Sequence, residues 1–142
     1  MKTIKIAGFI RLGEFGGLSA TTTKKQVEDM FGPPEACSQE KHGSVVWKFG
    51  RVQLFFLREH LVQIFVYYSE NTSDTSMSPL ILDDDFKANP TLTAFQKFLN
   101  EADISWKIIP ELTFEKQICM ETSAGIKLIF DGEHCTKIGK AF

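Results

Sequence analysis

The chain has 142 residues, of which 43% are hydrophobic and 24% charged, a balance that lets one compact domain bury a core without a disulfide or a metal. A formal net charge of −2 argues against a nucleic-acid or membrane partner and slightly favours a basic one. The three cysteines form no CxxC pair, so we predict buried thiols and no cofactor or metal. The chain has no secretory signal pattern and no apolar run near the roughly 18 residues of a membrane helix, so we predict a cytoplasmic location.

The N-terminal part predicts a strand, a loop and a helix. Residues 3–10 alternate between apolar and polar side chains, which is typical of a half-buried strand. The glycine cluster at residues 13–17 has no phosphate-binding spacing and predicts a plain loop. Thr23 and Gln26 then form a capping box, and Gly32, which two prolines follow, ends the helix that begins there.

Residues 45–68 predict three strands that turn at residues 50–51 and 58–60. One face of the last two strands is apolar and is expected in the core, with Val52, Leu54, Phe56, Val62, Ile64 and Val66. The opposite face holds Gln53, Phe55, Leu57, Leu61, Gln63, Phe65 and Tyr67. It is too aromatic for a surface that only meets water, so we expect something to cover it.

A polar run at residues 69–79 lacks apolar periodicity. It predicts a linker between two structural repeats, at about 1–70 and about 80–142, within a single domain at 1–142. Three neighbouring carboxylates follow: Asp83, Asp84 and Asp85. Adjacent residues rarely converge on one ion and no EF-hand spacing is present, so a solvated acidic loop is favoured over a metal site.

The second half again predicts a helix followed by a sheet. Asn89 and Pro90 have the pattern of an N-cap and first turn, and apolar residues then recur at helical spacing over residues 92–102. The strands expected after this helix are residues 104–109 and 112–121, followed by a hairpin at residues 125–140.

One segment occurs twice, because VQLFFLREHLVQI at residues 52–64 returns as IKLIFDGEHCTKI at residues 126–138 with five identical positions. The two predicted helices align as well, at an offset of 68 residues against 74 for the hairpins. We therefore predict an α+β fold, a tandem repeat of a helix packed on an antiparallel β-meander, with the two sheets joined side by side.

The repeated segment contains Glu59 and His60 in one copy and Glu133 and His134 in the other, which could act as acid and base. Both pairs fall in hairpin turns, where polar residues are expected without catalysis. No nucleophile beside a base can be assembled from local spacing, although folding could still bring a cysteine and a histidine together. No catalytic residue is predicted.

A resemblance to known proteins rests on three segments: Thr22, Val27, Gly32 and Pro33 in the pattern T-x-x-x-x-V-x-x-x-x-G-P, WKFG at residues 47–50, and VQLFFLREHLVQI. The pattern resembles a group of short bacterial proteins, some of which occur as immunity-type genes beside polymorphic toxins. The tandem helix-plus-meander order is similar to the β-lactamase inhibitor protein and to the BamE-like unit that it duplicates. This resemblance implies two sheets side by side that bind partners on a shared concave face.

We therefore predict a non-catalytic binding protein, an immunity or inhibitor-type partner of a bacterial toxin or enzyme. The candidate anchors are Phe55, Leu57, Phe65 and Tyr67, with Asp83, Asp84 and Asp85 as an acidic rim. An alternative is a small-ligand or lipid-binding module whose aromatic face lines a groove between the two sheets. A third is a homodimeric structural protein that hides this face between two copies.

Overall fold

A computed structural model describes residues 2–68 and 80–142 of the chain, which form an α+β fold; the predicted linker at residues 69–79 lies outside the described residues. The helices are α1 (Ile6–Leu12), α2 (Lys24–Phe31) and α3 (Leu92–Glu101), with a 3-10 turn η1 (Pro110–Leu112). The strands before α3 are β1 (Lys2–Lys5), β2 (Ala36–Cys37), β3 (Ser44–Phe49), β4 (Val52–Leu57), β5 (His60–Tyr67) and β6 (Leu80–Asp83). Those after it are β7 (Trp106–Ile108), β8 (Gln117–Thr122), β9 (Lys127–Asp131) and β10 (His134–Ala141).

Eight of these strands form one antiparallel sheet in the order β2-β3-β4-β5-β10-β9-β8-β7. Pairing of β5 with β10 joins the meander of the first half to that of the second, with Val66 opposite Ile138 and Phe65 opposite Gly139. The strands β1 and β6 form a separate parallel pair. The three strands predicted within residues 45–68 and the hairpin at residues 125–140 are confirmed.

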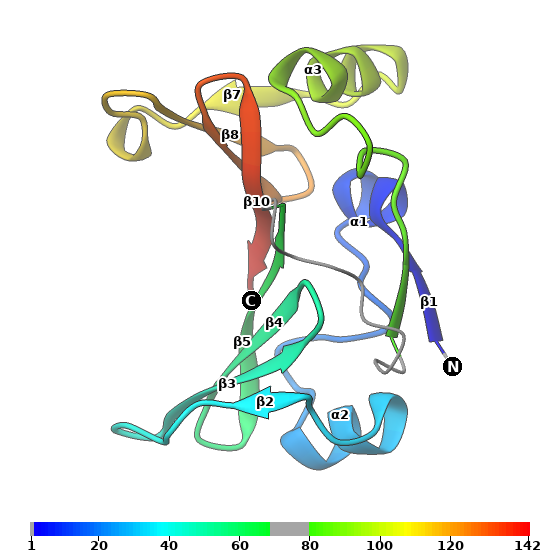
Figure 1. Cartoon of the computed structure of the whole chain (residues 1–142), viewed down its shortest axis with the longest axis vertical. Coiled ribbons are helices and arrows are strands. Elements are labelled where there is room, and N and C mark those ends of the chain that lie inside the picture. Colours follow the sequence, from blue (N-terminus) through cyan, green and yellow to red (C-terminus); the bar gives the residue numbers. More distant parts are fainter. Residues whose placement is uncertain (1, 69–79) are drawn as a thin grey trace.

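All three helices lie on one side of the large sheet (Figure 1). In that view α2 lies beside the first meander, α3 beside the second, and α1 between them, with β1 and β6 on the same side. Contacts between rings hold the outer helices, since Phe31 of α2 meets Phe49 at 6.0 Å and Phe95 of α3 meets Phe130 at 5.8 Å between centroids. The outer strands bend away from the helices, so the opposite side of the sheet is concave.

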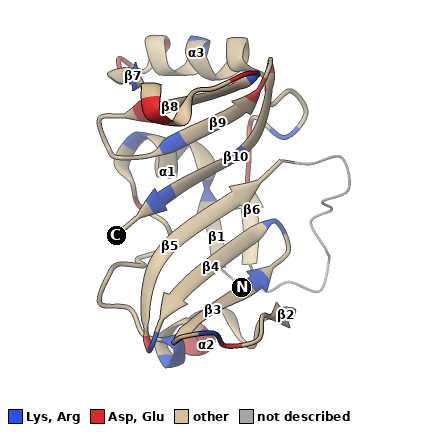
Figure 2. Ribbon diagram, turned by 90° about the vertical axis from the view of Figure 1, so that its left-hand side faces the viewer, with Lys and Arg blue, Asp and Glu red and all other residues tan. Residues whose placement is uncertain are grey.

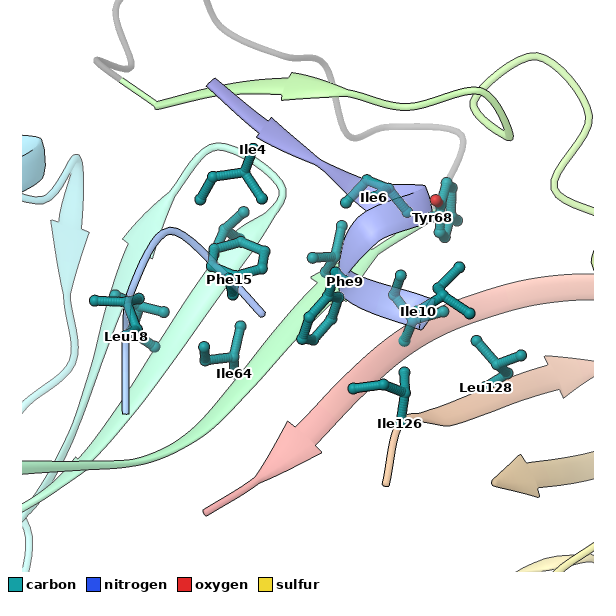
Figure 3. Close-up of a cluster of buried hydrophobic side chains, with 14 of the residues drawn as sticks. Ile4, Ile6, Phe9, Ile10, Phe15, Leu18, Ile64, Tyr68, Ile126 and Leu128 are labelled. Carbon is teal, nitrogen blue, oxygen red and sulfur yellow. The ribbon is translucent and has the colours of Figure 1, made fainter. Parts of the chain in front are cut away.

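The core lies between the helix layer and the sheet. Figure 3 shows Phe9 of α1 and Phe15 of the following loop close to Ile64 of β5. The two phenyl rings meet edge to face with centroids 5.0 Å apart, and all three side chains are buried. Burial of large rings is the main source of hydrophobic stability, so the segment around α1 fixes the junction where the two meanders meet.

The N-terminal residues correct the strand predicted at residues 3–10. The strand β1 stops at Lys5, and Ile6, Phe9 and Ile10 are buried at the i, i+3, i+4 spacing of a helix. Gly13 ends α1 in the left-handed conformation, with φ 72°, and its N–H donates to the carbonyl oxygen of Phe9 at 2.8 Å. Isoleucines two and four residues apart fit a strand and a short helix equally well, and the contact with the sheet selects the helix.

Threonine side chains cap both longer helices. The predicted capping box of α2 is confirmed, because Thr23 Oγ1 accepts from the Gln26 N–H at 3.2 Å and Gln26 Oε1 accepts from the Thr23 N–H at 2.9 Å. The cap of α3 is Thr91, whose hydroxyl oxygen accepts from the Ala94 N–H at 3.2 Å. The N-cap predicted at Asn89 is therefore wrong, because the chain reaches helical conformation only after it has paired with β10 at Thr91.

The hairpin turns that contain the repeated Glu-His pairs hold the start of each longer helix. In both halves the backbone of the turn exchanges hydrogen bonds with the residues on either side of the threonine cap. The N–H to O=C pairs are Leu61 to Thr22 (2.9 Å), Lys24 to Glu59 (3.1 Å), Cys135 to Pro90 (2.8 Å) and Leu92 to Glu133 (2.8 Å). These turns therefore have matching structural roles in the two halves.

A register shift between β4 and β5 corrects one part of the predicted core face. Leu61 is buried and Val62 is half-buried, the reverse of the expected alternation, because an extra residue bulges out of β5 at this point. The strand β10 has a corresponding irregularity against β9. Beyond the shift the predicted alternation is confirmed, so that Ile64 is buried while Phe65 is half-buried on the other side of the sheet.

Strands β7 and β8 are shorter than the segments predicted at residues 104–109 and 112–121. Pro110 begins the turn η1 between them, since its fixed backbone and missing N–H interrupt the ladder. The connection exposes two large apolar side chains, Leu112 and Phe114, the latter 57% exposed. It reaches out on the concave side of the sheet (Figure 1, yellow).

Candidate functional site

Three aromatic side chains meet on the concave side of the sheet. The ring of Phe55 on β4 lies 5.7 Å from that of Phe65 on β5, which in turn lies 6.0 Å from the ring of Tyr67. All three are half-buried, although no α-helix in residues 2–68 and 80–142 packs on this side. We call this side of the sheet, around the three rings, the aromatic face; Figure 2 looks onto it. Leu57, also predicted as an anchor, ends β4 and is exposed.

Gly139 of β10 makes room for the central ring. It lies opposite Phe65 in the β5–β10 register, and a Cβ at residue 139 would overlap the phenyl ring and lie 2.9 Å from the carbonyl oxygen of Ile64. The ring therefore covers the glycine backbone of the neighbouring strand, an aromatic–glycine pairing that stabilises adjacent strands. This contact explains why Phe65 is half-buried although its side of the sheet is open.

A lysine lies over the rings. The ammonium nitrogen of Lys137 is 4.7 Å from the ring centroid of Phe65 and 5.8 Å from that of Tyr67. A cation at this distance is attracted to the negative face of a ring. Within the described parts of the chain, no carboxylate lies within ion-pair distance of Lys137. Neither the lysine nor the glycine was predicted, because their relation to the rings depends on the β5–β10 pairing.

The three predicted aspartates do not border the aromatic face. The strand β6, which leads into them, lies behind the large sheet in Figure 2, on the helix side. Asp83 and Asp85 are exposed there. Asp84 instead forms an internal ion pair, since its Oδ2 lies 2.8 Å from Nη2 of Arg51 and the two side chains are 1% and 2% exposed. The acidic rim expected beside Phe55, Leu57, Phe65 and Tyr67 is therefore not formed by these residues.

The phenol of Tyr68 belongs to this internal cluster. The Arg51 guanidinium lies over its ring at 5.0 Å, and its buried hydroxyl has no hydrogen-bond partner among the described residues. Burial, and then the negative charge of Asp84, raise the pKa of Tyr68 far above its ordinary value of 10.0. The phenol therefore stays protonated in the folded protein at pH values where the unfolded chain loses the proton.

The raised pKa predicts loss of stability in alkali. Above about pH 10 the unfolded state binds fewer protons than the folded state, so the free energy of unfolding falls by about 1.4 kcal/mol per pH unit for this group. Between pH 10 and pH 11, urea unfolding should show a shallower fall in the free energy of unfolding for Tyr68→Phe than for the wild type. Parallel pH profiles would contradict the assignment.

The predicted turn histidines and the cysteines provide no activated pair in the part of the chain that the structure describes. His60 and His134 are exposed at the starts of β5 and β10, as predicted for turn residues. Burial raises the pKa of the Cys135 thiol, whose Sγ donates to the carbonyl oxygen of Lys137 at 3.7 Å, so this group is held as a neutral thiol. Cys119 is also buried, but Cys37 is exposed in the short edge strand β2, which corrects the expectation that all three are buried.

The described residues contain no group of three or more His, Cys, Asp and Glu side chains placed to hold a metal ion. None of the helices within these residues has the length and apolar character needed to cross a membrane. Comparison of the chain with protein-family models, curated proteins and solved structures found no match.

A separate hollow lies away from the aromatic face. It has a volume of about 760 Å³ and is lined by parts of β1 and α1, the glycine loop at residues 13–17 and the end of β10. Lys140 lies at its wall and donates from Nζ to the carbonyl oxygen of Gly13 at 3.0 Å. The rings of the aromatic face do not line it. Because the strands of the two meanders belong to one continuous sheet, the rings do not lie between two separate meanders.

Proposed function

We propose that the protein is a non-catalytic protein-binding protein that holds its partner on the aromatic face, as an immunity or inhibitor-type protein does for a bacterial toxin or enzyme. The observation that carries this proposal is the contact of Phe55, Phe65 and Tyr67 on a concave sheet side without a covering helix in the described chain. Sheets usually bury such rings against a second layer. Aromatic clusters left open mark surfaces for partners.

The geometry of the face suits a protein partner. Its rings are fixed by one another and by Gly139, so little side-chain entropy is lost on binding. Rigid aromatic residues near the centre of an interface commonly supply most of the binding energy. The exposed Phe114 and Leu57 lie outside the ring cluster and offer further apolar contact area.

The proposal includes a duplicated unit of the kind found in the β-lactamase inhibitor protein and BamE-like proteins. Threonine caps start both longer helices, equivalent turns bind them, and a strand irregularity occurs at corresponding places in β5 and β10. Pairing of the two last strands turns two narrow meanders into one sheet broad enough to receive a protein surface.

Site-specific photo-crosslinking in the source cell tests the function. A photoreactive phenylalanine analogue placed at Tyr67 should form one or a few defined protein adducts. The same analogue at Leu12, which is 61% exposed on α1, serves as the control. The Tyr67 adducts should disappear when Phe65→Ala is added, while the melting temperature shows that the variant remains folded.

Two results would remove the proposed function. Identical adducts from Tyr67 and Leu12 would show that the aromatic face has no partner of its own. Adducts that consist of a second copy of the chain would assign the face to a homodimer, which sedimentation at micromolar concentration would confirm independently.

A further inference from the structure

We infer that the segment bound on the aromatic face is acidic: a protein loop or strand that places an Asp or Glu carboxylate on Lys137 and an adjacent apolar side chain on Phe65 and Tyr67. This inference names the chemistry of the partner and rests on the proposed function. It is carried by the distribution of charge over the sheet.

Four neighbouring strands of the sheet contain no carboxylate. No Asp or Glu occurs in β3, β4, β5 or β10, whose lysines are Lys48, Lys137 and Lys140. Lys140 turns toward the helix side, where it binds the carbonyl oxygen of Gly13. Lys48 and Lys137 remain on the aromatic face, because they are paired with Gln53 and Tyr67, whose side chains point to that side of the sheet.

Charges of both signs lie on this side of the second meander. Residues that are paired on neighbouring strands point to the same side of a sheet. The pairings run from Gly139 to Lys127, from Lys127 to Glu121 and from Glu121 to Lys107, so both lysines lie on the side of Gly139. Glu121 lies 3.7 Å from Lys127 and offsets one of these charges. Asp131 is at the far end of β9, and Glu111 and Glu115 belong to the connection between β7 and β8 that reaches out on the concave side. The strands that hold the rings, with their neighbours β3 and β10, therefore carry lysines and no carboxylate, although the chain as a whole has a formal net charge of −2.

Lys137 is the group that selects the partner's charge. It is half-buried, and its described neighbours are the two rings rather than a carboxylate. A partner that covers the face removes water from the ammonium, which costs free energy unless the partner supplies a counter-charge. A carboxylate meets this need with a short charge-assisted hydrogen bond. A basic segment, which the net charge of the chain would favour, would be repelled.

The ring geometry favours a protein segment over a single strand of nucleic acid, which also combines negative charge with affinity for aromatic rings. Stacking of a base needs a free ring face. The ring of Phe65 rests against Gly139 and lies under the Lys137 ammonium, so an incoming base would have to displace the lysine. An apolar side chain can instead pack against the exposed ring edges while its neighbouring carboxylate binds the lysine.

Selection from a phage-displayed library of random peptides tests the inference directly. Peptides that bind the wild type and lose binding to Phe65→Ala/Tyr67→Ala should be enriched in Asp and Glu beside aromatic or aliphatic residues. A selected peptide, measured by fluorescence anisotropy, should bind Lys137→Met roughly tenfold more weakly and should bind more weakly still in high salt. Lys137→Arg should retain most of the affinity. Lys25→Met, on the exposed side of α2, is the matched control and should bind as the wild type does.

The outcomes separate the inference from the proposed function. Peptides that require Phe65 and Tyr67 but carry no excess of acidic residues would overturn the inference and leave the binding face intact. Selection that yields no peptide dependent on the two rings would also overturn it, and the crosslinking result would then decide whether the face binds a partner at all. Tighter, ring-dependent binding of oligothymidylate than of every selected peptide would assign the face to single-stranded nucleic acid instead.

Discussion

Asp84→Asn is expected to lower the free energy of unfolding by about 3–5 kcal/mol, as measured by urea denaturation at pH 7. The substitution keeps the shape of the side chain but leaves the Arg51 guanidinium without the carboxylate that lies 2.8 Å from it. Both side chains are almost fully buried, so water cannot replace the lost charge. Arg51 keeps its contact with the ring of Tyr68 and its hydrogen bond to the carbonyl oxygen of Tyr67 at 3.4 Å, each of which gains less than a buried ion pair.

Two comparisons isolate the buried charge as the cause. Asp29→Asn breaks the exposed pair between Lys25 and Asp29, 3.6 Å apart, and should change stability by at most about 0.5 kcal/mol. The double variant Arg51→Met/Asp84→Leu removes both charges and should be more stable than Asp84→Asn alone. If Asp84→Asn lowers the free energy of unfolding by less than about 1 kcal/mol, the ion pair does not hold the β3–β4 turn against the segment after β6.

Sequence periodicity predicted the elements whose local signals agree with their packing. The capping box at Thr23, the glycine and prolines after α2, and the alternating strands β3 to β5 all fall where expected. The pattern failed at residues 3–10, where short apolar spacing fits two conformations. It also failed at Leu61, because the extra residue that bulges out of β5 is set by pairing between strands.

The candidate site could be predicted only in its aromatic half. Alternation along β4 and β5 put Phe55, Phe65 and Tyr67 on one side, since strand side chains alternate with period two. The residues that give this side its charge and its shape, Lys137 and Gly139, belong to β10 and meet the rings only through pairing across some seventy residues of chain. The partner of Asp84 lies 33 residues away, which local spacing cannot reveal.

The alanine substitution Gly139→Ala tests the contact that orders the aromatic face. It should lower the free energy of unfolding by about 1–3 kcal/mol, because the added methyl group overlaps the Phe65 ring and crowds the carbonyl oxygen of Ile64. The ring has to leave its place over the β10 backbone, and the β5–β10 pairing that joins the two meanders is strained. Urea denaturation measures the loss. The ring-current shift of the Gly139 Hα protons in the wild type, absent in Phe65→Ala, reports the ring position independently.

A double-mutant cycle separates the ring from the backbone as the source of this cost. In Phe65→Ala/Gly139→Ala the methyl group at residue 139 meets no ring, so the double variant should lose less stability than the sum of the single variants, by about 1 kcal/mol or more. The close approach to the Ile64 carbonyl oxygen remains in the double variant and sets the residual loss. Additive losses would mean that Phe65 does not rest on Gly139. The rings would then not be fixed before a partner arrives, and binding on this face would have to order them first.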